Sequence, residues 1–395
     1  MPRPTEASLA ALLAALEGEL EAAGELRRRL HAAPELAHEE HATAAALARA
    51  LPVAAQTAAG TGLLALVAGP DPSAAPVAVR AELDGLPIEE RTGAPFSARG
   101  AAMHACGHDV HMAALVALTR AAASLGEQLP APLLAVFQPS EEAYPSGARM
   151  LAEEAPALRG SRAVVAAHIH PELPWGSLAL EEGSVNASCD AFEIVIEGRS
   201  THGAYPHRGR DPVLALSEAV LALHAAAGRR IDPLHPASLT VGVLSAGSAE
   251  NVIPDRATAR GALRAHRPED RELLRGLCAE VVSGVAAAHG CSGEVRITPG
   301  EPPLHNDAAI VAAGGELLAA GGFARAPAWR SCGSDDFSFF GALAPVAMAF
   351  VGLDGAPGFV PRPLHHPELL APEEAVAAVA RAQALMYVAA TQASR

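Results

Sequence analysis

The sequence contains no lysine, so arginine supplies all 29 of its basic side chains. They are outnumbered by 44 acidic side chains, and the formal net charge is −15 at pH 7. Nucleic acids and anionic membrane surfaces attract positively charged proteins, so this balance argues against both as partners. Ala, Pro and Gly are heavily used, and this bias fits genome base composition better than it fits a function.

Cysteine is scarce, with five residues in a chain of 395. The number is odd, no CxxC pair occurs, and the residues are widely scattered: Cys106, Cys189, Cys278, Cys291 and Cys332. A disulfide framework needs paired cysteines, so the pattern favours a reducing compartment.

Long apolar runs are also missing, and no stretch reaches the length that a bilayer-spanning helix needs. The N-terminal segment carries acidic residues through an Ala and Leu pattern, without the basic start and apolar core of a signal peptide. We therefore expect a cytoplasmic protein.

Half of the residues are hydrophobic, which is enough for a large core, and the length suggests more than one domain. Short apolar runs bounded by Gly and Pro predict strands, and three- and four-residue apolar spacing predicts helices. The predicted strands cover residues 63–67, 77–79, 133–137, 163–167 and 346–351. The predicted helices cover residues 6–30, 40–50, 113–123 and 372–387. Because strands and helices alternate, the sequence predicts an α/β fold with a mainly parallel sheet covered on both faces.

The pattern changes near residue 185. Strands are predicted over 192–196, 238–243, 257–263 and 294–297, and helices over 212–226 and 269–289. This βαββαβ order is the ferredoxin-like arrangement and is self-contained. We therefore predict a ferredoxin-like α+β domain over 185–298, inserted into a domain made of residues 1–184 and 299–395.

Residues 103–111, with the sequence MHACGHDVH, hold three imidazoles, a thiol and a carboxylate. Histidine and cysteine side chains suit a transition metal such as zinc. Cys106 and His108 alone do not close a metal site, since such a site needs at least three protein ligands. An ordinary buried helix start fits the same stretch, and the stretch alone does not separate the two interpretations.

Ionisable residues follow two of the predicted strands. Glu141 and Glu142 come after the run 133–137, and His168 comes after the run 163–167. Ligands collect beyond the carboxyl ends of parallel strands, so these side chains are expected to converge there. Such convergence favours a metal site, although the glutamate pair taken alone is more typical of a solvated acidic turn.

Two further clusters carry candidate functional groups. His365 and His366 lie in a proline-flanked loop, where a plain surface role is an open alternative. In the predicted insert, Arg260 and Arg264 lie on one face of a strand by period-two geometry. Two guanidiniums on one face suit an anionic substrate group, but solubilising charges on an edge strand give the same pattern.

Together these motifs resemble the M20 metallopeptidase family, in the amidohydrolase branch of aminoacylases, hippurate hydrolases and indoleacetyl-amino acid hydrolases. The resemblance spans nearly the whole chain. It rests on His31 and on residues 34–36, 84–87, 103–111, 138–142, 168–171, 202–207, 251–255, 333–337 and 364–367. It implies a metallohydrolase catalytic domain whose inserted domain serves as a lid and in dimerisation.

The resemblance also implies roles for individual residues. It places two divalent ions, Zn²⁺, Mn²⁺, Co²⁺ or Ni²⁺, on the ligands Cys106, His108, Glu142, His168 and His365. It makes Glu141 the general base. It makes His202 a catalytic group that reaches into the active site of a partner subunit, which implies a homodimer or a higher homo-oligomer. Asn251 and Arg264 resemble groups that hold the substrate, through its carboxylate.

Asp84 and Asp335 are implied to support the ligands from behind. Glu82 stands where this branch usually has Asp, and Asp335 stands where it usually has Glu. These departures bear on metal affinity and metal choice, and not on the reaction itself. Residues 143–146 replace the usual glycine-rich stretch and bear on the shape of the acyl pocket.

The implied function is hydrolysis of the amide bond of an N-acyl amino acid by a metal-activated water. A dipeptidase or carboxypeptidase on the same scaffold is the main alternative, and a non-catalytic binding protein is a further one. The expected partner is a small amide substrate, with no nucleic acid and no membrane.

Overall fold

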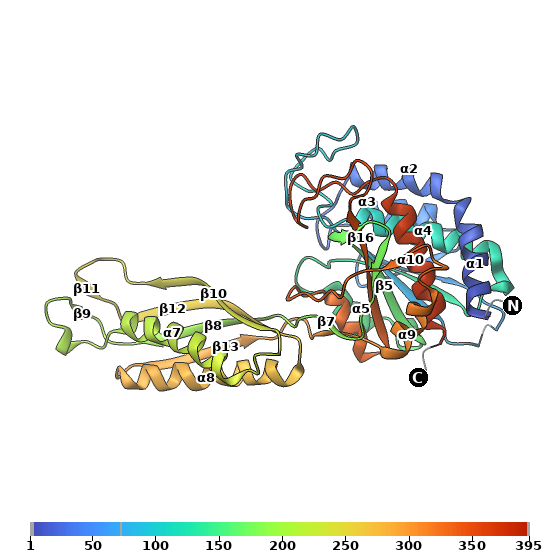
Figure 1. Ribbon diagram of the computed structural model, residues 1–395. Coiled ribbons are helices and arrows are strands. Elements are labelled where there is room, and N and C mark those ends of the chain that lie inside the picture. The colour runs from blue at the N-terminus through green and yellow to red at the C-terminus, as the bar shows by residue number, and fades with distance from the viewer. Residues whose placement is uncertain (1–3, 72, 393–395) are drawn as a thin grey trace. The chain divides into compact units, whose positions relative to one another are not determined.

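A computed structural model describes residues 4–71 and 73–392 of the chain, drawn in Figure 1. The chain forms two compact units. Within the described residues, the first unit runs to Gly183 and resumes in His305–Trp329 and from Asp336 onward. The second unit comprises Ser184–Leu304 and Arg330–Asp335, so it contains the predicted insert and extends beyond it. Two short strands lie near the crossings between units: β7 (Gly183–Asn186) and β14 (Leu304–Asn306).

The first unit is built on an eight-stranded sheet with the order β1-β2-β4-β3-β5-β16-β6-β15. The central strands β4, β3, β5 and β16 run parallel to one another, whereas β1, β2 and β4 pair antiparallel. The mainly parallel sheet that the sequence predicts is therefore confirmed. The strands are β1 (Ala55–Ala58), β2 (Gly62–Val67), β3 (Val77–Glu82), β4 (Leu133–Gln138), β5 (Ala163–Pro174), β6 (Ser177–Ala179), β15 (Ala324–Arg325) and β16 (Val346–Asp354).

Helices cover this sheet and bury its centre. Strands β3 and β4 are buried along their whole length, as expected for central strands covered on both faces. Helices α4 and α10 pack against each other and against the sheet (Figure 1). The helices are α1 (Pro4–Glu17), α2 (Leu20–His31), α3 (His41–Ala50), α4 (His108–Leu125), η1 (Gly126–Gln128), α5 (Gly147–Glu154), α6 (Pro156–Arg159), α9 (Ala308–Leu317), η3 (Asp336–Ala342) and α10 (Ala375–Ala390).

The single helix predicted over 6–30 is wrong, because the structure has two helices there. Helix α1 ends at Glu17 and α2 begins at Leu20, with a turn at Gly18 and Glu19 between them. Glycine is among the poorest helix formers, since it loses the most backbone freedom on ordering. Apolar spacing continues through the turn, so periodicity alone does not reveal the break.

The second unit is a four-stranded antiparallel sheet with the order β10-β12-β8-β13, and helices α7 and α8 pack on it (Figure 1). Its chain order is βαββαβ, as the sequence predicts. The elements are β8 (Asp190–Glu197), β9 (Thr201–His202), η2 (Pro206–Arg208), α7 (Pro212–Arg230), β10 (Ala237–Ala246), β11 (Val252–Ile253), β12 (Arg256–Ala265), α8 (Pro268–Ala288) and β13 (Ser292–Thr298).

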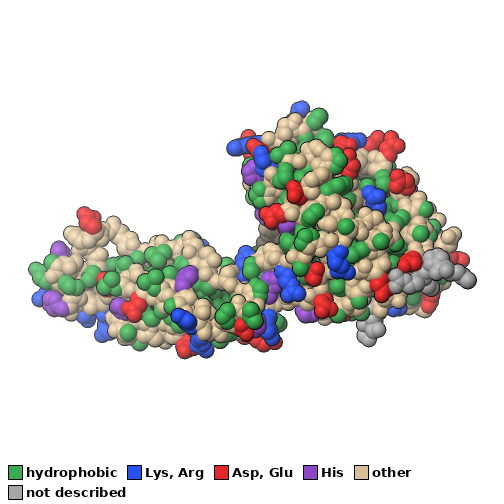
Figure 2. All heavy atoms as spheres, viewed as in Figure 1, with side chains coloured by type: hydrophobic (Ala, Val, Ile, Leu, Met, Phe, Trp, Pro, Cys, Tyr) green, Lys and Arg blue, Asp and Glu red, His purple; other side chains and the backbone are tan. Residues whose placement is uncertain are grey.

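Apolar side chains reach the surface of the second unit, as Figure 2 shows. Among them are Leu214 and Leu221 on α7, which are 59% and 73% exposed, and Val243 and Leu244 on the edge strand β10. Among the described helices, none combines the length and the apolar composition needed to cross a membrane.

Candidate metal centre and active site

The turn after β4 presents Glu141 and Glu142. Ser140 adopts a positive φ of 49°, and its backbone N–H donates to the carboxylate of Glu40 at 2.7 Å. Both carboxylate oxygens of Asp84 then accept backbone N–H groups, from Glu141 at 3.1 Å and from Glu142 at 2.9 Å. The chain turns at this point, so neighbouring glutamates are not forced to opposite sides of an extended strand. Asp84, which follows β3, thus fixes the backbone of both.

Helix α4 begins at His108, directly after Gly107. Gly107 has a φ of 82°, and a Cβ atom there would lie 2.2 Å from Cδ1 of Ile169, so glycine is required on both counts. His108 donates from Nδ1 to the backbone carbonyl of Asp84 at 2.7 Å. When the ring is neutral, its Nε2 atom carries the lone pair, and this buried atom has no hydrogen-bond partner among the described residues. A buried lone pair of this kind suits a metal ion.

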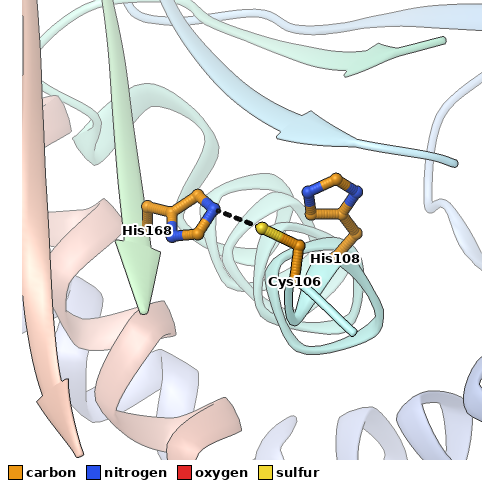
Figure 3. Close-up of side chains that lie close together, drawn as sticks. All are labelled: Cys106, His108 and His168. Atoms are coloured by element: carbon orange, nitrogen blue, oxygen red, sulfur yellow. Dashed lines mark hydrogen bonds between the residues drawn. The ribbon is translucent and has the colours of Figure 1, made fainter. Parts of the chain in front are cut away.

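His168 presents its ring to Cys106, with 3.5 Å between Nε2 and Sγ, and His108 lies on the other side of the thiol (Figure 3). The Nδ1 atom of His168 donates to the carbonyl of Ile169 at 2.6 Å, which leaves the lone pair on Nε2. Burial and the nearby His111 ring hold the pKa of His168 well below its usual value. His168 is therefore a neutral imidazole, the form that binds metals.

His168 lies inside a strand, and not at a strand end as predicted. Strand β5 continues to Pro174 because its later part still pairs with β16, where His168 lies opposite Phe350. On the other side, the pairing of β5 with β3 stops at Ala166. His168 therefore lies past the last residue of β5 that pairs with β3, and the expected convergence is retained.

His365 reaches Glu142 from far along the chain, with 3.1 Å between its Nε2 and Oε1 of Glu142. Its backbone φ is 65°, and its N–H donates to the carbonyl of Ala105, next to Cys106. Burial by itself raises the pKa of Glu142. The neighbouring His365 and His108 lower this pKa by a larger amount, so it lies below its usual value. Glu142 is thus held as a carboxylate, the form that a metal needs.

The ligand atoms of the predicted residues form overlapping groups. Within each group the atoms lie within 4.8 Å of one another: Cys106, His108 and His168; Cys106, Glu142 and His365; and His108, Glu141 and Glu142. Burial lowers the pKa of His108, but Glu82, Asp84 and Glu142 raise it, and the net direction is up. This excess of negative charge attracts a cation, so the donor set fits divalent metal ions that bind thiolate, imidazole and carboxylate.

Behind the predicted ligands lies a buried polar network that contains Glu82, which the resemblance implies as a supporting residue, and also His111 and Arg80, for which the sequence predicts no such role. His111 donates from Nδ1 to Glu82 at 2.8 Å and accepts the N–H of Ile169 on Nε2 at 3.1 Å. Both ring nitrogens are therefore engaged, and His111 fixes the backbone next to His168 instead of offering a metal a lone pair. Glu82 is paired with Arg80, which is also fully buried. In the sequence, the signal that could have revealed this network is a pair of charged residues inside the otherwise apolar strand β3.

The remaining predicted residues belong to the second unit. His202 on β9 pairs in register with Val252 on β11, and the N–H of Gly203 donates to the carbonyl of Asn251 at 2.7 Å. His202 and Asn251 are therefore neighbours within that unit. Arg264 on β12 donates to the carbonyl of Cys332 at 3.0 Å. Asp335 ends the segment Arg330–Asp335 and is buried. The roles of these four residues stay predictions.

A mainly parallel α/β sheet that gathers imidazoles, a thiol and carboxylates at one edge is the arrangement of a metal-dependent hydrolase. Comparison with known proteins supports the same class of enzyme. The family model of peptidase family M20/M25/M40 matches residues 78–387. The chain belongs to this family and is a hydrolase of its amidohydrolase type.

Individual relatives are similar over most of their length. N-acetyl-L-cysteine deacetylase of Bacillus subtilis is 35% identical over 89% of this chain and 84% of its own. N-acetyldiaminopimelate deacetylase of Bacillus pumilus is 33% identical over 89% of this chain and 93% of its own. The Bacillus subtilis protein YXEP, a dinuclear metal-binding peptidase from the M20 family, has a crystal structure that matches with a TM-score of 0.84 and 30% identity, over 96% of this chain and all of that one.

Proposed function

We propose that the protein hydrolyses the amide bond of N-acyl amino acids and that it uses two divalent metal ions. The proposal is supported by one observation above others. Glu141 is 13% exposed, and its Oε2 lies 3.8 Å from Nε2 of His108, at the margin of the ligand cluster. A carboxylate beside the metal ligands, with part of its surface open, is placed to exchange a proton with water.

The proposed ligands are Cys106, His108, Glu142, His168 and His365. These residues would hold the metal ions, which would supply a lower pKa for a water molecule at the site and a polarised amide carbonyl. Glu141 takes a proton from the attacking water and passes it to the leaving nitrogen. Asp84 keeps Glu141 in position through the backbone N–H bond described above. The products are a carboxylic acid and an amino acid.

The relatives named above support the substrate class, since their names describe deacetylation of N-acetyl amino acids. The experiment is a hydrolysis screen on protein that has been stripped with a chelator and reloaded with Mn²⁺, Zn²⁺ or Co²⁺. Acyl group and amino acid are varied independently, and dipeptides are assayed beside them. We expect hydrolysis of N-acyl amino acids that disappears with chelator and returns with metal. Preference for dipeptides would replace the proposal with a dipeptidase, and no hydrolysis with any metal would reject catalysis.

The role of Glu141 is tested by Glu141→Gln. We expect metal content, measured by atomic spectroscopy, to stay near that of the unchanged protein while turnover falls by about 10²- to 10⁴-fold. Glu153→Gln is the matched control, because the Glu153 side chain is 64% exposed and pairs with Arg149 on the same helix. Retained turnover in metal-loaded Glu141→Gln protein would contradict the assignment.

We further propose a homodimer in which His202 polarises the substrate carbonyl in the partner's active site, while Asn251 and Arg264 bind the substrate carboxylate. The exposed Leu214 and Leu221 of α7 support a subunit contact on the second unit. A mixture of Glu141→Gln and His202→Ala subunits tests this. If His202 acts across the dimer, the mixture regains activity that neither variant has alone. A mixture as inactive as its components, in a protein shown to exchange subunits, would reject the proposal.

A further inference from the structure

An aromatic cluster lies next to the metal ligand His168. The ring centroid of Trp329 is 4.1 Å from that of Phe350 and 4.6 Å from that of His170. The His170 and Phe350 rings are 6.4 Å apart and nearly perpendicular. The two separations that involve His170 are those of attractive contacts between aromatic rings, and the Trp329 and Phe350 rings lie closer still. We call these three residues the aromatic wall.

Strand geometry places the aromatic wall beside the site. His168 and His170 are two residues apart on β5 and therefore project from the same face of the sheet. Phe350 on the parallel strand β16 pairs in register with His168, and their ring centroids are 6.5 Å apart. All members of the wall and the ligand belong to the first unit. The wall is therefore a continuation of the ligand cluster.

The exposure of the wall is graded. Phe350 is 5% exposed and forms its base, whereas Trp329 and His170 are only partly buried. A surface of two partly open rings over a buried third offers stacking contacts. Packing alone does not require tryptophan and histidine rings to stay partly open beside a metal ligand.

We propose that the aromatic wall receives the acyl group of the substrate and favours flat, apolar acyl groups over acetyl. This inference rests on the proposed function. The acyl group is bonded directly to the carbonyl carbon that must lie at the ligands, so it begins within a few bonds of His168. The amino-acid carboxylate, at the opposite end of the substrate, is assigned above to groups of the second unit. When the acyl group lies on the aromatic wall, the carboxylate end of the substrate remains available to those groups.

The test compares kcat/KM for N-benzoyl and N-acetyl derivatives of one amino acid on metal-reconstituted protein. Stacking between aromatic rings contributes about 0.5–1.5 kcal/mol beyond simple burial. We therefore expect Trp329→Ala to lower the ratio of benzoyl to acetyl activity by about two- to twelvefold, and Trp329→Phe to restore most of it. A merely structural role would lower both activities together and leave the ratio unchanged.

Trp175→Ala is the matched control, because Trp175 is the only other tryptophan in the chain and packs at the edge of the core of the same unit. The ratio is expected to stay constant in this variant. An unchanged ratio in Trp329→Ala protein that still cleaves both substrates would overturn the inference. A changed preference for the amino acid, with acyl preference constant, would also overturn it.

A second measurement separates this inference from the proposed function. In Trp175→Phe protein, Trp329 is the sole tryptophan, so its fluorescence reports on the wall without turnover. We expect benzoate to change this fluorescence saturably and acetate to leave it unchanged. If the hydrolysis screen fails but benzoate still binds, the proposed function is rejected, and the result supports the aromatic wall as a binding surface for aromatic acids. If hydrolysis succeeds but benzoate has no effect up to saturating concentrations, the wall assignment falls alone.

Discussion

The two units of the chain bury their sheets differently. In the first unit, β3 and β4 are buried at every position, and α4 and α10 are buried along most of their length. In the second unit, β13 alternates between exposed and partly buried residues. A sheet covered on both faces can carry side-chain chemistry in a dry interior, whereas a sheet covered on one face leaves a surface free.

Buried charge shows the same contrast. In the first unit, Arg80 is fully buried between the carboxylates of Glu82 and Asp336. In the second unit, Asp190 is buried, but the arginines that pair with it, Arg271 and Arg275, remain partly exposed. Buried charge networks therefore lie behind the proposed metal ligands. Such networks hold their side chains in fixed positions. Removing one member is strongly destabilising, because it leaves a buried charge without a partner.

The largest expected effect is on Arg80. Replacing it in Arg80→Leu leaves Glu82 and Asp336 buried without their cation, and we expect a loss of about 3–5 kcal/mol in the free energy of unfolding. Arg296→Leu in the second unit is the control, since Arg296 lies 3.7 Å from Glu193 and both side chains are exposed. In Arg296→Leu, the loss in the free energy of unfolding should stay below about 1 kcal/mol. Urea unfolding followed by circular dichroism measures both, and equal losses would remove the contrast between the units.

Identical truncations probe the two cores. Leu118 on α4 is fully buried in the first unit, and Leu239 on β10 is only partly buried against the second core. We expect Leu118→Ala to lower the free energy of unfolding by about 2–5 kcal/mol, because it creates a cavity. Leu239→Ala should lower it by roughly 1 kcal/mol, because less apolar area is lost. Hydrogen exchange, measured on peptides of each unit, assigns each loss; a larger effect at Leu239 would refute the one-sided description of the second core.

His31 gives the first unit a pH dependence. Burial lowers the pKa of His31, but Asp109 and Glu90 raise it, to about 9. Protonated His31 therefore stabilises the folded state. This contribution is complete when the pH is below the usual pKa of 6.5, and it is lost as the pH rises through about 9. We expect roughly 2 kcal/mol to be lost between about pH 6 and pH 9.

The variant His31→Gln should flatten this alkaline decline in urea unfolding. His289→Gln in the second unit is the control, because His289 is partly exposed and contacts Glu218 at its surface. The decline should persist in that variant. A decline that survives in His31→Gln protein would show that another group is responsible.

Cysteine reactivity gives the smallest expected effect and compares three thiols in one experiment. If Cys106 is a metal ligand, bound metal should slow its alkylation by iodoacetamide about tenfold or more, since the free thiolate is the nucleophile. Alkylation of metal-free protein should block later metal uptake. Cys332 is exposed and should react equally in both forms, while Cys278 should stay unmodified, because burial raises its pKa to about 11. Mass spectrometry resolves the three sites, and metal-independent alkylation of Cys106 would exclude it as a ligand.

Much of the fold can be predicted from local pattern. Alternating apolar strands and helices predict the parallel sheet, and the order βαββαβ predicts the second unit. The turn at Gly18 is not predicted, because apolar spacing continues through it, and the extension of β5 past His168 is not predicted, because it depends on pairing with β16. Residue types and motif order likewise pointed to Cys106 and His108, but neither residue closes a site without partners that are distant in the sequence.

By itself, the sequence determined the side chains available to this protein, which are imidazoles, a thiol and paired carboxylates, and its strand pattern predicted the sheet that carries them. Only the tertiary structure decided how each group is used. The carbonyl of Asp84 selects the tautomer of His108, and the contacts of His111 with Glu82 and Ile169 withdraw it from the ligand set. The physical reason is that a hydrogen bond depends on distance and direction between groups far apart in the chain, which composition and spacing do not contain.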